Sequence, residues 1–133
     1  MQPAEQERRP VDPGRWDEKY DSHFSQAFVA DRFVFVSGQL ATDADGKLVG
    51  GDDVAQQARQ VFENIAAILA SEQLDLRSVV SVNVFVTDIE DIPRIAPVRR
   101  ELFGEHRPAS TAVEISRLLL PGAKLEINAV ALR

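Results

Sequence analysis

One long amphipathic segment constrains the fold of this chain more than any other feature. In residues 52–74, DDVAQQARQVFENIAAILASEQL, apolar side chains recur every three or four residues, which is the period of an α-helix. Asp52 or Asp53 is a typical N-cap at its start. The apolar stripe consists of Val54, Ala58, Val61, Phe62, Ile65, Ile68 and Leu69. Because this stripe is broad enough to cover a sheet, the segment is predicted to be a core helix rather than a cofactor-binding element.

The residues before this helix have the pattern of strands and turns. The run AFVADRFVFVSGQL, residues 27–40, contains two apolar stretches joined at Ala30-Asp31-Arg32, which predicts a hairpin. Its second stretch ends at Ser37-Gly38, and a glycine after a β-branched strand indicates a bend or a close approach to the backbone. The Asp-Gly pair in DADGKL, residues 43–48, predicts a turn.

The residues after this helix alternate between strand and helix signals. SVVSVNVFVTD, residues 78–88, predicts a strand with one valine face (Val80, Val82, Val84 and Val86) and one half-polar face (Ser81, Asn83 and Phe85). Residues 91–106 predict a shorter helix, broken or late to start because it contains two prolines. Strands are expected at about 110–115 and 124–132. The order β-β-α-β-α-β-β predicts an α+β two-layer sandwich, a mixed sheet backed by two helices.

Composition narrows the classes of function. The chain of 133 residues has a net charge of −6 and no cysteine. The acidic balance disfavours nucleic-acid binding, and the missing cysteines exclude thiolate catalysis, disulfides and cysteine zinc sites. No apolar segment has the length of a signal h-region or a membrane span, so a cytoplasmic protein is expected. Residues 1–20 are predicted to be an extension, mobile or lying along the surface, in which Trp16 packs on the domain, residues 21–133, or on a partner.

The last predicted strand carries the clearest candidate for chemistry. Leu125, Ile127, Ala129 and Ala131 share one face, and Glu126 and Asn128 share the other. A carboxylate between leucine and isoleucine is expected to be partnered or to have a shifted pKa. The spacing alone leaves open that both polar residues lie on an exposed face or at a subunit contact.

Other candidates are weaker. His23 and His106 have no metal-ligand spacing, so no metal site is expected, and His106 is interpreted as a cation at a helix C-terminus. Ser110 has no neighbouring base. The remaining basic candidates, on the second helix, are interpreted as a solvated face: Arg94, Arg99 and Arg100.

Several segments together resemble the YjgF/Rid family, also called endoribonuclease L-PSP. They are SGQL, DVAQQARQVFENI, VNVFVTDIEDI, RPAST followed by VEI, and KLEINAVA, and the resemblance extends from about Tyr20 to Arg133. It implies a chorismate-mutase-like fold and a homotrimer with clefts between subunits. In the deaminating branch, RidA, it implies hydrolysis of enamine and imine acids without metal or cofactor, by an arginine that binds the substrate carboxylate and a glutamate that positions water.

The resemblance assigns roles to particular residues. Glu126 matches the family's glutamate, whereas Ser110 stands where the arginine is expected. Ser37 and Gly38 match the backbone that borders the cleft, and Arg117 matches an arginine that ordinary members carry; Arg107 could also reach the cleft. Further departures in the cleft are Phe24 for a tyrosine, Ala96 for an asparagine, Arg99 for a tyrosine and Ala112 for a cysteine.

These departures lead to three hypotheses of function. The first is hydrolysis of a C=N compound other than the usual 2-iminobutanoate, with catalytic Glu126. Its substrate would be bound by Ser110, Ser37, Gly38, Phe24, Phe85, Asn128 and Ala112. The second is a non-catalytic trimer that binds a metabolite, and the third is an endoribonuclease, which the acidic charge disfavours. A lost arginine clamp is expected to weaken carboxylate binding by about 2–5 kcal/mol.

Overall fold

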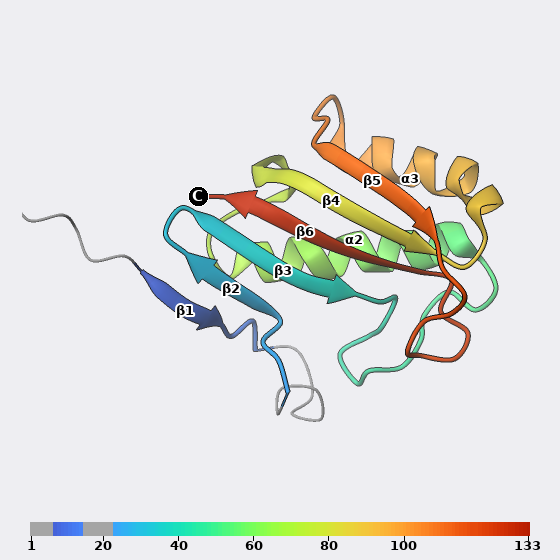
Figure 1. Ribbon diagram of the computed structural model, residues 1–133, viewed down its shortest axis with the longest axis horizontal. Helices are drawn as coiled ribbons and strands as arrows, with labels where there is room; N and C mark the ends of the chain where they lie inside the picture. Colours follow the sequence, from blue (N-terminus) through green and yellow to red (C-terminus); the bar gives the residue numbers. More distant parts are fainter. Residues whose placement is uncertain (1–6, 15–22) are drawn as a thin grey trace, which may run out of the picture.

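The computed structural model describes residues 7–14 and 23–133, and these form a mixed six-stranded sheet with helices on one face (Figure 1). The elements are β1 (Arg8–Val11), β2 (Ala27–Ala30), β3 (Phe33–Gln39), α2 (Val54–Ala70), β4 (Val79–Val86), α3 (Ile92–Phe103), β5 (Ala109–Glu114) and β6 (Leu125–Leu132), with 3-10 turns at Leu76–Ser78 and Ile89–Asp91. The strand order is β1-β2-β3-β6-β4-β5. Only the β4–β5 pair is parallel within this described sheet. The predicted α+β sandwich of two layers is confirmed.

Strand β1 is an addition to the predicted order. It lies within the segment that the sequence assigns to an extension, and it pairs antiparallel with β2 at the edge of the sheet. The guanidinium of Arg9 donates two hydrogen bonds to the Glu72 carboxylate just after α2, and Val11 is buried. Pro10 and the polar composition hid this strand, because prolines are tolerated on edge strands. Trp16 lies outside the described residues.

Helix α2 confirms the prediction from the amphipathic stripe. The Asp53 side chain caps it by accepting from the backbone N–H groups of Ala55 and Gln56, at 3.0 and 3.3 Å. All seven residues of the predicted stripe are buried. The helix therefore supplies the core layer on which the sheet packs.

The hairpin of β2 and β3 is also confirmed. It turns at Asp31, whose φ of 55° lies in the left-handed region that aspartate tolerates better than most residues. The second helix is less interrupted than predicted, because Pro93 lies in its first turn and the helix continues through Pro97.

The β4 strand corrects one residue of the predicted valine face. Val82, Val84 and Val86 are buried as expected, but Val80 is 40% exposed and Val79 is buried in its place. The pairing with β6 shifts register between Val79 and Ser81, which is a β-bulge. The extra residue of the bulge reverses the alternation before Ser81 and turns Val80 out of the core.

The sheet has a helix face and an open face. The helix face carries the buried alternating residues of the central strands, such as Val34, Val84 and Ile127. The open face carries Phe28, Phe33 and Phe35, which are exposed; Phe28 lies opposite Phe35 in the ladder. This division decides which candidate residues can meet within one chain.

Candidate functional site

A β-bulge at the end of β3 shapes the candidate site. Val36 pairs with Ala129 and Gln39 pairs with Ile127, so that Ser37 and Gly38 together lie opposite one residue of β6. The bulge turns Gln39 towards the core, where it is buried. It leaves Gly38 beside the side chain of the next outward-pointing residue of β6, Glu126. The sequence predicted a bend or a close approach at this glycine, and the structure confirms both.

Glu126 occupies the space that a side chain at residue 38 would fill. A Cβ atom added to Gly38 would lie 2.6 Å from Oε2 and 2.7 Å from Cδ of Glu126, closer than real Cβ contacts. Glycine is therefore needed here for the carboxylate and not for backbone strain. The Glu126 carboxylate therefore lies directly over Gly38, at the end of β3.

The Glu126 carboxylate has unusual electrostatics for a glutamate. It is half-buried, and within residues 7–14 and 23–133 it accepts no hydrogen bond and forms no ion pair. Burial raises the pKa of this carboxyl above its ordinary value, because burial disfavours the charged form. The shift that the sequence suggested is confirmed, and its cause is desolvation without a compensating partner. A carboxylate of this kind is suited to accept a proton.

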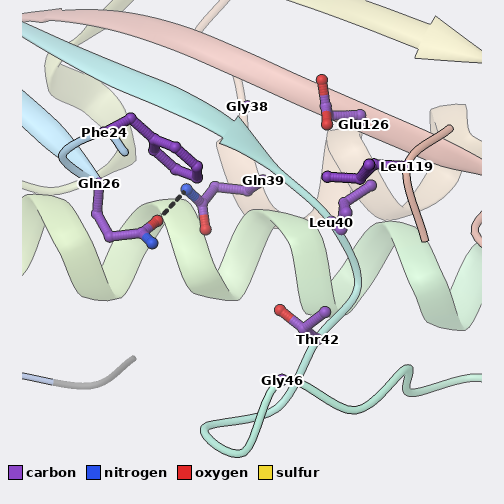
Figure 2. Close-up of a pocket in the computed structure, with 9 residues that line it drawn as sticks. All are labelled: Phe24, Gln26, Gly38, Gln39, Leu40, Thr42, Gly46, Leu119 and Glu126. Carbon is purple, nitrogen blue, oxygen red and sulfur yellow. Dashed lines mark hydrogen bonds between the residues drawn. The ribbon is translucent and has the colours of Figure 1, made fainter. Parts of the chain in front are cut away.

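A pocket of about 90 Å³ lies next to Glu126 (Figure 2). Figure 2 shows Leu119 beside Glu126 and Leu40, while Phe24 and Gln26 lie near Gln39. The amide of Gln39 donates to Gln26 Oε1 at 3.0 Å. The lining residues are Phe24, Gln26, Gly38, Gln39, Leu40, Thr42, Gly46, Leu119 and Glu126. The pocket is thus mainly apolar, with one carboxylate at its edge.

Two buried amides on α2 hold the loops that border this pocket. Asn64 Nδ2 donates to the carbonyl oxygens of Leu40 and Thr42, at 3.1 and 2.9 Å. Gln57 Nε2 donates to the carbonyls of Gly51 and Gly122, and its Oε1 accepts from the Lys124 N–H at 2.8 Å. The sequence interpretation missed both residues. Their signal was present, because they are two polar residues seven apart that fall on the apolar stripe of the helix.

Three further predicted residues lie near Glu126, with different contacts. Phe85 is directly opposite Glu126 in the β4–β6 ladder, on the open face. Asn128 lies two residues along β6, and its Oδ1 accepts from Asn83 Nδ2 at 3.0 Å. The Ser37 hydroxyl donates to the Ser25 carbonyl at 2.6 Å, so it positions the β3 bulge.

Ser110 and Ala112 do not join this group within one chain. In the parallel ladder Ser110 pairs with Val82 and Ala112 with Val84, whose side chains face the helices. Glu126 pairs with Phe85 on the open face. The prediction that Ser110 and Glu126 face one cleft is therefore not met within a single chain, because they project from opposite faces of the sheet.

Arg99 lies on this helix face beside Ser110. Its Nη1 donates to Ser110 Oγ at 2.8 Å, and its Cζ lies 5.9 Å from the centre of the Phe103 ring. The interpretation of Arg94, Arg99 and Arg100 as one solvated face is wrong for Arg99, which is only partly exposed. Arg94 is exposed and pairs with Asp91 at 2.7 Å.

His106 has a contact that the sequence did not predict. One ring nitrogen, Nε2, lies 2.6 Å from the Val79 carbonyl, and the ring stacks on Phe103 at 6.2 Å between centres. The histidine therefore ties the end of α3 to β4, while Arg107 donates to the carbonyls of Gly104 and His106. In the described part of the chain, no three His, Asp or Glu residues gather in a way that could hold a metal. None of the described helices is long and apolar enough to cross a membrane.

The fold and the pocket define a small α+β protein with a carboxylate site at a bulge on the open face of its sheet. The model of the family described as Endoribonuclease L-PSP matches residues 19–133. The chain belongs to this family, the YjgF/Rid family. The resemblance stated from the sequence segments is thereby confirmed.

Curated relatives cover most of the chain. A RutC family protein of Pyrococcus horikoshii is 42% identical over 109 residues, which are 81% of this chain and 85% of the relative. The human 2-iminobutanoate/2-iminopropanoate deaminase is 34% identical over 111 residues, 83% of this chain and 80% of the relative. The similarity thus covers most of the length of both this chain and the human deaminase.

Solved structures share the fold over nearly the full length. Yeast Mmf1 superimposes with a TM-score of 0.87 at 33% identity, covering 96% of this chain and 99% of that chain. E. coli TdcF with bound serine superimposes with a TM-score of 0.83 at 30% identity, covering 94% and 98%.

Proposed function

We propose that this chain hydrolyses a small imine, or the imine tautomer of an enamine, at its C=N bond in a cleft between subunits of a homotrimer. The observation that carries the proposal is Glu126, a half-buried carboxylate with a raised pKa and no partner among the described residues, placed beside a glycine and an apolar pocket. The name of the human relative, an iminobutanoate deaminase, supports the same reaction class.

The reaction requires water to be added to the carbon of the C=N bond. Glu126 accepts a proton from this water as its oxygen bonds to the carbon, which gives a carbinolamine. Glu126 returns this proton to the nitrogen and then transfers a second one from the carbinolamine hydroxyl to the nitrogen, so that the C–N bond breaks and ammonia leaves a carbonyl product. A pKa raised towards neutrality favours both transfers, because the same group must accept and return a proton.

The intersubunit location is supported by the placement of the candidates. Ser110 and Glu126 lie on opposite faces of the sheet, so one ligand can touch both only if they come from two copies of the chain. The exposed Phe28, Phe33 and Phe35 give the open face an apolar surface suited to a partner subunit. A closed symmetric assembly repeats the same cleft at each contact.

The ligand is expected to differ from that of members with an arginine on β5. Ser110 offers a hydroxyl where those members have a guanidinium, and the loss of such a charge-assisted contact reduces binding of a carboxylate at that position about thirtyfold or more. We therefore expect 2-iminobutanoate to be a poorer substrate here than in members whose guanidinium is on β5. RNA is not the proposed substrate, because a net charge of −6 gives little attraction for phosphate.

Ammonia release from freshly generated imines tests the proposal. Wild type should accelerate release from at least one imine, and Glu126→Gln should lower that rate by about a hundredfold or more. Glu63→Gln, the same change on an exposed face of α2, should leave it unaltered. Ser110→Arg should raise the rate with 2-iminobutanoate.

Equal rates in wild type and Glu126→Gln would overturn the hydrolytic assignment. If no imine is turned over but small acids raise the melting temperature, the non-catalytic binding function would replace it.

A further inference from the structure

We propose that Arg99, on helix α3, is the residue that binds a ligand carboxylate in this protein, taking over from β5 the task of anion recognition. This inference rests on the proposed function for the identity of the ligand as a substrate, but the binding site itself follows from contacts around Arg99. It makes Arg99 a specificity-determining residue for anionic over neutral compounds.

The first support is that most of the hydrogen-bonding capacity of Arg99 is unused. A guanidinium has five N–H donors in a planar fork. Within residues 7–14 and 23–133, its hydrogen bonding is limited to the contact with Ser110 Oγ, and it forms no ion pair. A partly buried cation that is left with a neutral hydroxyl lacks the acidic partner that normally accompanies one.

The second support is the concentration of positive charge around it. A pocket of about 160 Å³ beside Arg99 is lined by Ala96, Arg99, Arg100, Phe103, His106 and Arg107, with no acidic residue among them. Neither Arg100 nor Arg107 forms an ion pair with another described residue. In a chain of net charge −6, three unpaired arginines at one small pocket are a local exception. They would attract an anion.

The electrostatics of Arg99 itself agree with this assignment. Burial first, and the charge of Arg107 second, lower the pKa of the Arg99 guanidinium from its ordinary value. Both effects disfavour its charged form, and a bound carboxylate would reverse them. The guanidinium stays charged at neutral pH, because the pKa of arginine begins far above it.

Two neighbouring side chains orient the Arg99 guanidinium. The Phe103 ring lies 5.9 Å from Cζ and supports the guanidinium from one side, while Ser110 accepts a hydrogen bond from Nη1. Arg107 is held by the carbonyls of Gly104 and His106. The serine thus positions Arg99, and its short side chain leaves the edge of β5 open to a ligand. A pocket of this volume suits the carboxylate of a small acid better than a nucleotide.

Binding of 2-oxobutanoate, the acid that forms when 2-iminobutanoate is hydrolysed, provides the test, with neutral 2-oxobutanamide as its matched probe. Titration calorimetry on the full chain should show that wild type prefers the acid. Arg99→Gln should weaken binding of the acid about thirtyfold or more and leave binding of the amide unaltered. Arg99→Lys keeps the charge but loses the planar fork of N–H donors, so its affinity for the acid should lie between those of wild type and Arg99→Gln. Arg94→Gln removes the same charge from an exposed position of α3 and should bind like wild type.

The outcomes separate this inference from the proposed function. Equal binding of the acid by Arg99→Gln and wild type, or no binding by wild type, overturns the role of Arg99 even where Glu126-dependent hydrolysis is observed. Arg99-dependent binding without any turnover supports the anion site while the hydrolytic function fails. If a short RNA binds through Arg99 and 2-oxobutanoate does not displace it, the ligand is a phosphate backbone and the carboxylate assignment is overturned. Melting curves of each variant verify that it is folded.

Discussion

At the scale of the residue, the candidate site depends on a missing side chain. Gly38 has an ordinary backbone conformation for its bulge, and its value lies in the space that it leaves for Glu126. A carboxylate at this position is close to backbone and to apolar side chains, which explains why its proton affinity is raised. Because the two residues are in contact, the effects of substitutions at Gly38 and Glu126 on stability should not be additive.

Gly38→Ala should displace the Glu126 carboxylate and lower imine turnover, while the protein stays folded. The added Cβ would lie 2.6 Å from Oε2, so the side chain has to rotate away; overpacking of this kind costs about 1–3 kcal/mol. Denaturant unfolding of Gly38→Ala, Glu126→Ala and the double variant measures the coupling. If alanine at 38 destabilises the Glu126→Ala protein as much as wild type, the clash is not with the carboxylate.

The pH dependence of stability should report the state of Glu126. Its pKa is higher in the folded than in the unfolded chain, so folding is penalised while the carboxyl is ionised in both states. This penalty is full above the folded pKa and disappears as the pH falls to the unfolded value near 4.5. Glu126→Gln should therefore be more stable than wild type at neutral pH.

Unfolding of both proteins by urea from about pH 4 to about pH 8 provides the measurement, because this range begins near the ordinary pKa of glutamate. The stability advantage of Glu126→Gln should shrink as the pH falls through the raised pKa of the wild-type carboxyl. An advantage that is constant over the whole range would mean that burial of this charge is not its source.

At the scale of the element, the sequence predicted most of the fold because local patterns agree with the tertiary structure. The stripe on α2, the hairpin around Asp31 and the alternation of β6 each follow from a period that one buried face imposes. Strand β1 could not be found in this way, since Pro10 breaks the residue pattern typical of a strand and the contact of Arg9 with Glu72 joins residues 63 apart in the sequence.

The site was predicted only in part for the same reason. Glu126 was recognisable as a carboxylate within an apolar strand, and Gly38 was recognisable as a glycine at the end of a β-branched strand. The opposed faces of Ser110 and Glu126 depend on the order in which β5, β4 and β6 pair, and residues far apart in sequence decide that order. The bulge at Val80 likewise shifts a register that simple alternation cannot anticipate.

Strand β1 should contribute to stability through one buried side chain. Val11 is 4% exposed, and truncation by Val11→Ala should reduce the free energy of unfolding by about 1–2 kcal/mol. Arg9→Ala, which breaks a partly exposed ion pair, should cost less than about 1 kcal/mol. Urea unfolding compares the two; equal and negligible losses would mean that β1 is not part of the cooperative unit.

At the scale of the whole molecule, the open face of the sheet leaves large apolar side chains exposed to solvent. It carries several exposed phenylalanines, and the edge strand β5 is exposed along its length. Apolar surface of this kind and unpaired strand edges are normally covered, because they otherwise promote aggregation. The proposed trimer would cover the open face.

Phe35→Glu should prevent assembly without unfolding the chain. Phe35 is 47% exposed at the centre of the aromatic surface, so a charge there would be buried against the neighbouring subunit. Sedimentation velocity should show smaller particles, and circular dichroism an unchanged fold. Ile89→Glu, at a residue 43% exposed beside α3, is the matched control and should assemble normally. Assembly of the Phe35→Glu protein like wild type would place the interface elsewhere.

The projection of Glu126 and Ser110 from opposite faces of one sheet has a consequence for mixed populations of subunits. Each copy would donate its glutamate to one cleft and its Arg99–Ser110 pair to another. Two alleles that are each impaired, Glu126→Gln and Arg99→Gln, would then complement one another when co-expressed. In a random trimer about a quarter of the clefts would combine the two intact halves. A cell carrying both defective genes would recover more activity than either gene supports alone.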